Sequence, residues 1–126
     1  MKEKFYRCPI CGNFFGVIHD SGAVPICCGK PMEVVEANST EASHEKHIPV
    51  VELQGDKLHV KVGSVPHPML LEHYIQWIFV VTNKGRHRMV LEPNKPAETV
   101  VALVPGEKVL RVYAYCNLHG LWVKEL

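Results

Sequence analysis

Nine cysteine and histidine side chains, of the types that can bind transition metals, fall into two groups with different chemistry. The first group contains only sulfur: Cys8, Cys11, Cys27 and Cys28. The second group, further along the chain, mixes one cysteine with histidines: His47, His67, His73, Cys116 and His119. Four thiolates fill a tetrahedral site, which suits a structural or electron-passing ion, whereas a nitrogen-rich set can leave a coordination position open. The sequence therefore predicts one closed site and a second site whose ligand set could leave a position open for a reaction.

The spacing of the first group indicates metal binding but does not choose the metal. Cys8 and Cys11 flank a two-residue turn, and Gly12 gives the backbone the freedom that such a turn needs. Zinc ribbons repeat this Cys-x-x-Cys spacing, but Cys27 and Cys28 are adjacent, so their sulfurs must splay to opposite sides of the backbone. Spacing alone favours a zinc staple at this site, with an iron centre as the alternative.

The second group lies in loops or at strand ends. His67 is held between Pro66 and Pro68, whose fixed φ angles make a rigid arm. Cys116 and His119 share a turn that ends at a glycine, and His47 comes just before an expected strand. Loops and strand ends are where a β domain gathers functional groups. A second structural zinc and an open iron site both fit these residues.

The other histidines are interpreted as ordinary polar residues. His59 shares a strand face with lysines and is expected at the surface, while His19 and His44 fall in turn or linker sequence. His87 stands between two arginines and has no evident partner in the sequence.

The chain reads as all-β, with two domains. Residues 1–36 form a small Cys-rich domain with short strands near 14–18 and 32–35, and a domain of that size needs a metal or a partner to fold. Residues 37–47 are a polar linker that runs into a loop of the second domain, 37–126. Alternation and turn residues predict strands over 48–53, 57–62, 74–82, 86–91, 99–104 and 109–115. The strand over 109–115 is expected to be the last long one, and no helix of useful length is predicted. This pattern is typical of an antiparallel sandwich or barrel.

Composition excludes several functions. The 14 Lys and Arg nearly balance the 13 Asp and Glu, so no strong field favours nucleic acid or an anionic membrane surface. No apolar run is long enough to span a bilayer, and the charged start lacks a secretory h-region. These features predict a reducing cytoplasm, where cysteines bind metal more often than they form disulfides.

Several sequence motifs together resemble the desulfoferrodoxin family. The adjacent cysteines, with Cys8-Pro-Ile-Cys11-Gly, resemble its desulforedoxin-like domain. Glu45-Lys46-His47-Ile-Pro-Val, Gly63-Ser-Val-Pro-His67-Pro-Met and Tyr115-Cys116-Asn-Leu-His119-Gly resemble its superoxide reductase domain. The motifs stand in the family's order and cover essentially the whole chain.

This resemblance implies an FeS4 centre on the four N-terminal cysteines and favours iron over zinc. It implies a second, square-pyramidal ferrous centre with His47, His67, His73 and His119 as equatorial ligands and Cys116 as the axial ligand. Glu45 and Lys46 would stand over the vacant position. It further implies an immunoglobulin-like β-sandwich, a homodimer, reduction of superoxide to hydrogen peroxide, and an external electron donor such as a rubredoxin. The alternative is an iron protein that only carries electrons, while a zinc-ribbon nucleic-acid binder is disfavoured by the balanced charge.

Overall fold

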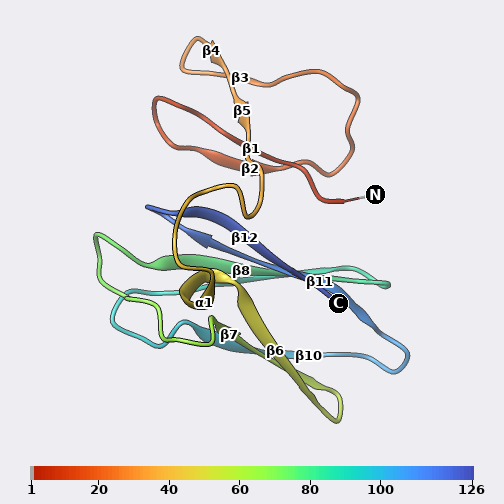
Figure 1. Cartoon of the computed structure of the whole chain (residues 1–126). Coiled ribbons are helices and arrows are strands. Elements are labelled where there is room, and N and C mark those ends of the chain that lie inside the picture. The colour runs from red at the N-terminus through yellow and green to blue at the C-terminus, as the bar shows by residue number, and fades with distance from the viewer. Residues whose placement is uncertain (1) are drawn as a thin grey trace. The chain divides into compact units, whose positions relative to one another are not determined.

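The computed structural model describes residues 2–126, which form two compact units, one ending at Glu36 and the other beginning at Ala37 (Figure 1). Within residues 2–126, no helix is long and apolar enough to cross a membrane.

The first unit is built from very short strands. β1 (Phe5–Arg7) lies between β2 (Phe14–Gly16) and β5 (Glu33–Val34), and β3 (Ile26–Cys27) pairs with β4 (Lys30–Pro31). Its core consists of Tyr6, Cys8 and Met32, with Val17 and Cys27 packed against it. The strands expected near 14–18 and 32–35 are present but shorter, whereas β1 and the β3–β4 hairpin were not predicted. So small a core stabilises little, which fits a unit held together by its cysteines.

The second unit is an antiparallel sandwich of two sheets. Its strands are β6 (Pro49–Gln54), β7 (Lys57–Val62), β8 (Ile75–Thr82), β9 (Arg86–Val90), β10 (Glu98–Ala102), β11 (Val109–Cys116) and β12 (Gly120–Glu125). One sheet has the order β10-β7-β6, and the other has the order β12-β11-β8-β9. A three-stranded and a four-stranded antiparallel sheet are the layers of an immunoglobulin-type sandwich, so the predicted all-β fold is confirmed.

Alternating side chains fill the space between the sheets. On β7, Leu58, Val60 and Val62 are buried, whereas Lys57 and Lys61 on the opposite face are exposed. Six buried residues of β8 and β11 belong to the same core cluster: Ile75, Ile78, Val80, Val112, Ala114 and Cys116. Each fully buried Val, Leu or Ile contributes about 1.5–3 kcal/mol of transfer free energy. Cys116 is thus a member of the hydrophobic core as well as a candidate ligand.

The structure differs from the sequence prediction in the segments beside the second group of ligands. Residues 44–47 form a single turn of helix, α1 (His44–His47), where a loop was expected. β12 was not predicted, although it supplies the edge of the four-stranded sheet. Asn38, in the expected linker, pairs with β12 through its side chain: Asn38 Nδ2 donates to the Val123 carbonyl at 3.2 Å, and Val123 N–H donates to Asn38 Oδ1 at 2.9 Å.

His87 has a partner that the sequence did not indicate. Its Nε2 lies 2.9 Å from Oε2 of Glu107, which also accepts a hydrogen bond from Thr82 Oγ1 at 2.6 Å. The backbone N–H of Val104 donates to the other oxygen of Glu107 at 3.1 Å. The His87 and Thr82 hydrogen bonds, followed by that of Val104, lower the pKa of Glu107 to about 2. His87 therefore has a partner, Glu107, that was not evident in the sequence.

Candidate metal centres

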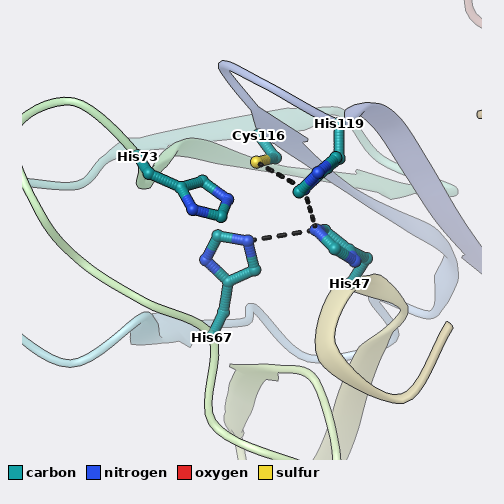
Figure 2. Close-up of side chains that lie close together, drawn as sticks. All are labelled: His47, His67, His73, Cys116 and His119. Carbon is teal, nitrogen blue, oxygen red and sulfur yellow. Dashed lines mark hydrogen bonds between the residues drawn. The ribbon is translucent and has the colours of Figure 1, made fainter. Parts of the chain in front are cut away.

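Five residues from three separate segments converge at one end of the sandwich (Figure 2). His47 ends α1, His67 lies in the loop between β7 and β8, and His73 forms a bridge with Leu70 just before β8. Cys116 ends β11, and His119 lies in the turn that leads into β12. One potential ligand atom from each residue lies within 4.8 Å of all the others. The structure thus brings together all five residues that the sequence singled out in the second group.

The four imidazoles form a closed ring. Ring centroids are 4.6 Å apart for His47 and His67, and 4.9 Å apart for His67 and His73. The ring closes through His119, whose centroid lies 5.0 Å from those of both His73 and His47. His47 Nε2 lies 3.0 Å from His67 Nε2 and 3.2 Å from His119 Nδ1. Nitrogens bound at right angles at about 2.1 Å from one ion would lie about 3.0 Å apart. These separations therefore suit a shared metal ion.

The protonation of the rings supports the same interpretation. Nδ1 of His47 lies 2.6 Å from the Ser43 carbonyl oxygen, and Nδ1 of His67 lies 2.6 Å from the Pro68 carbonyl oxygen. A carbonyl oxygen can only accept, so each Nδ1 carries a proton and donates it. In the neutral rings, both Nε2 atoms then present lone pairs to each other at 3.0 Å. A cation between them turns this repulsion into attraction.

Burial favours the neutral form of three of the four imidazoles. It lowers the pKa of His47 and His73, and it lowers the pKa of His67 to about 4. Nε2 of His73 is buried and has no hydrogen-bond partner among the residues that the structure describes. An unpartnered buried nitrogen is costly unless it binds something else. Neutral imidazole is also the form that binds a metal, so the residues present fit an ion.

Cys116 contributes the single sulfur and is fully buried. Its sulfur lies 3.9 Å from His119 Nδ1. Burial raises the pKa of the Cys116 thiol, while the backbone N–H groups of His119 and Leu118 point at the sulfur and lower that pKa. A bound divalent cation would outweigh the burial, because a coordinating thiol loses its proton.

The backbone of the segment before His47 is held by contacts with the residues that directly follow β7. The Glu45 carbonyl oxygen accepts a hydrogen bond from Val65 N–H at 2.9 Å and one from Ser64 Oγ at 3.3 Å. Gly63 packs so closely that an added Cβ would lie 2.5 Å from the same oxygen. The side chains of Glu45 and Lys46 are exposed. The backbone that presents both charged side chains next to His47 is therefore held in place by the loop that also presents His67.

The four N-terminal cysteines also converge, with one potential ligand atom from each within 4.8 Å of the others. Cys11 Sγ lies 3.6 Å from Cys27 Sγ, and Cys27 Sγ lies 4.0 Å from Cys28 Sγ, close to the roughly 3.8 Å expected between sulfurs about 2.3 Å from one tetrahedral ion. Cys28 and Gly29 both have positive φ, at 54° and 73°. This backbone conformation allows the side chains of two adjacent cysteines to leave the backbone in different directions and still bring both sulfurs to the same metal position.

Backbone N–H groups prepare the first of these sulfurs for a metal. Cys8 is fully buried, and its sulfur accepts hydrogen bonds from the N–H groups of Cys11 and Ile10, each at 3.4 Å. These bonds, with that from Cys11 the stronger, lower the pKa of Cys8 to about 6. None of the five cysteines forms a disulfide, and all are free.

One residue beside the second cluster was missed from the sequence. Trp122 is fully buried in β12, stacks on the His47 ring and donates a hydrogen bond to the His119 carbonyl oxygen at 3.0 Å. A predicted strand over 120–125 that pairs with the strand ending at Cys116 would have placed Trp122 on the same face of the sheet as Cys116. Trp122 is two residues after Gly120, the partner of Cys116, and side chains two residues apart on a strand share a face.

Comparison with known proteins gives matches over nearly the whole chain. Residues 39–125 match the family described as desulfoferrodoxin, and residues 1–35 match its N-terminal domain. The chain is 44% identical to the desulfoferrodoxin of Syntrophotalea carbinolica over 124 residues, which is 98% of this chain and 97% of that one. It is 37% identical to the desulfoferrodoxin of Nitratidesulfovibrio vulgaris over 122 residues, 97% of this chain and 95% of that one.

Solved structures give the same picture. The crystal structure of the superoxide reductase from Treponema pallidum superposes with a TM-score of 0.85 at 36% identity, covering 99% of this chain and 100% of that chain.

Proposed function

This chain belongs to the desulfoferrodoxin family, and from that membership we propose how its residues divide the work of the enzyme. The protein is a superoxide reductase, an oxidoreductase. Its four-cysteine cluster and its four-histidine, one-cysteine cluster are consistent with the two iron centres of desulfoferrodoxin. The predicted resemblance is confirmed, and the roles of individual residues form the proposal.

The second cluster is the proposed catalytic centre. His47, His67, His73, Cys116 and His119 hold one iron ion. The observation that carries this assignment is the pair of opposed Nε2 lone pairs on His47 and His67, 3.0 Å apart, beside the buried and unpartnered Nε2 of His73. When ferrous iron is bound there, it supplies one electron to superoxide, which takes up two protons and leaves as hydrogen peroxide.

The charge of the proposed site suits a small anion. Imidazole binds a metal in its neutral form, so the two positive charges of a ferrous ion and the single negative charge of the Cys116 thiolate would leave one net positive charge. Lys46 adds an exposed ammonium one residue before His47. A nearby cation raises the encounter rate with superoxide, and Lys46 also orders the delivery of protons from solvent. We assign Lys46 to substrate attraction and proton supply.

Glu45 is assigned a different role. Its carboxylate would repel superoxide, so it does not assist the encounter. It is instead proposed to act on the oxidised resting form, by approaching the centre after the product has left.

The four-cysteine unit, residues 1–36, is proposed to hold an FeS4 centre on Cys8, Cys11, Cys27 and Cys28. Four thiolates occupy every coordination position of a tetrahedral ion, so superoxide cannot bind there. Residues 37–126 are therefore proposed to form the catalytic domain. The first unit then stabilises the fold, forms a contact between two copies of the chain in a homodimer, or passes electrons to the catalytic centre.

A small electron-donor protein such as a rubredoxin would re-reduce the catalytic centre. The five free thiols support a reducing compartment, the cytoplasm.

Metal analysis and pulsed superoxide test this proposal together. Protein purified without oxygen should hold two irons per chain. After oxidation, the thiolate-to-iron absorption band of the second centre should disappear when Cys116 is replaced. Reduced protein should give one hydrogen peroxide per superoxide consumed and release no oxygen. A yield of half a peroxide per superoxide, with oxygen release, would indicate dismutation. No reaction with superoxide would instead indicate an electron carrier.

A further inference from the structure

Trp122 occupies a position that lets one side chain contact two candidate ligands. It lies in β12 directly opposite Ala114 of β11, two residues after Gly120, which lies opposite Cys116. Side chains two residues apart on a strand point to the same face, so Trp122 shares the face of the sheet that carries Cys116. The small Ala114 side chain opposite leaves room for the indole. Trp122 is fully buried there.

The indole contacts the first ligand through its face. Its ring plane is 22° from that of His47, and the ring centroids are 4.9 Å apart. His44, one turn earlier in α1, meets the same indole edge-on at 5.3 Å. The His47 ring is therefore fixed by stacking on one face and by the bond from Nδ1 to the Ser43 carbonyl at its edge. Together these contacts restrict both side-chain torsions of His47.

The indole contacts the second ligand through its N–H. Trp122 Nε1 donates to the carbonyl oxygen of His119 at 3.0 Å. The backbone N–H of the same residue, His119, points at the sulfur of Cys116. One hydrogen bond therefore anchors the turn that presents both His119 and Cys116.

We propose that Trp122 is a positioning residue for the second metal centre, and that it fixes His47 and the Cys116–His119 turn as one unit. This inference rests on the proposed ligand set. Nδ1 of His119 and Nε2 of His47 are neighbours in the ring of imidazoles, 3.2 Å apart. The indole sets this spacing from both sides, by stacking on one ring and bonding the backbone of the other. Groups that orient metal ligands change metal affinity by about 10- to 100-fold when they are removed.

Two substitutions separate the two contacts. Trp122→Phe keeps an aromatic face for His47 but removes the N–H that bonds to the His119 carbonyl. Trp122→Leu removes both contacts. Trp77→Phe is the matched control, because it removes the other tryptophan of the same sheet, whose ring stacks on Tyr115 at 5.6 Å rather than on a ligand. The four-cysteine iron serves as an internal reference for iron content in every variant.

The measurements are iron retained against a competing chelator, the thiolate-to-iron absorption band, and the electron paramagnetic resonance of the oxidised centre. We expect Trp122→Phe to shift the band and the resonance and to weaken iron retention at the second site about tenfold, with a larger loss in Trp122→Leu. Trp77→Phe should match the parent protein. Folded Trp122→Phe with parental band, resonance and retention would overturn the proposal, whether or not Trp122→Leu folds. Loss of the second iron from the parent protein itself would instead overturn the proposed function.

Discussion

Gly63 and the carbonyl oxygen of Glu45 approach so closely that any side chain at position 63 would collide with the backbone at position 45. A Cβ at Gly63 would lie 2.5 Å from that oxygen and 3.0 Å from the Ile48 carbonyl oxygen. Both neighbours are backbone atoms, which cannot move aside as the end of a flexible side chain can. The end of β7 thus determines where the segment with Glu45 and Lys46 lies.

Gly63→Ala should therefore move this segment as well as strain it. We expect a loss of about 1–3 kcal/mol in the free energy of unfolding and slower reaction with superoxide. Urea unfolding and pulsed superoxide measure the two effects. Gly85→Ala is the control, because a Cβ at Gly85 would meet nothing within 4 Å. Equal stability and rate in the two variants would show that the close approach has no consequence.

Cys116→Ser should keep the colour of the four-cysteine centre and abolish the charge-transfer band of the second iron. Serine is a harder and much less acidic ligand than cysteine, so the soft, electron-donating ligand is lost. We expect the superoxide rate to fall at least about tenfold. Absorption spectra and pulsed superoxide check both expectations. An unchanged rate would exclude Cys116 as a ligand.

Lys46→Ala should retain both irons and lower the second-order rate with superoxide roughly tenfold at low ionic strength. The rate of the variant should also depend less on salt concentration. The attraction between the Lys46 ammonium and superoxide is screened by salt, and the variant lacks this attraction. Lys57→Ala is the control for the same change in net charge, since Lys57 begins β7 and lies at the opposite end of that strand from Gly63. If both variants lose the same rate, the effect comes from net charge and not from the position of Lys46.

Glu107→Gln should change how stability depends on pH. The folded-state pKa of Glu107 is about 2, below its ordinary value of 4.5. A depressed carboxyl pKa stabilises the fold above the ordinary value, and this stabilisation is lost as pH falls from 4.5 toward 2. The variant should therefore unfold more easily than the parent near pH 6, and the difference should shrink in acid.

Urea unfolding at several pH values measures this difference. Any iron loss in acid affects parent and variant alike, so only their difference is interpreted. Glu52→Gln, an exposed residue of β6, is the control and should leave the pH profile unchanged. A gap between Glu107→Gln and the parent that stays constant down to pH 2 would show that the Glu107 carboxylate is not the titrating group.

A fragment of residues 37–126 should fold, hold one iron and react with superoxide when reduced. It contains the complete sandwich core and all five proposed catalytic-centre ligands. Single-turnover reaction of the reduced fragment with pulsed superoxide is the decisive measurement. A fragment that retains iron but fails to react would show that residues 1–36 take part in catalysis.

The strands of the sandwich could be predicted because their patterns are local. Leu58, Val60 and Val62 alternate with charged residues and are buried as expected. β12 was missed because it follows the Cys116–His119 turn without a separate turn signal. The partner of His87 could not be predicted, because Glu107 lies 20 residues away and meets it only through the packing of separate strands.

The candidate ligands could be selected from the sequence because prolines and short turns constrain them, as at His67 and at Cys116 with His119. Spacing alone favoured zinc at the four-cysteine site and left zinc and iron open at the second site, and the family resemblance favoured iron at both. The groups that orient the ligands could not be selected, since the Ser43 and Pro68 carbonyls and the Trp122 indole gain a role only from their position in the folded chain. The assignment of each ligand to iron stays a prediction.

Cys116 belongs to the hydrophobic core and to the candidate metal centre at once. Cys116 shares this cluster with Ile75 and Ala114, and Ile75 is its partner in the register of β11 and β8. Densely packed protein interiors transmit changes in side-chain volume. A substitution that changes side-chain volume beside Cys116 is therefore expected to alter both the stability of the fold and the position of the proposed ligand sulfur.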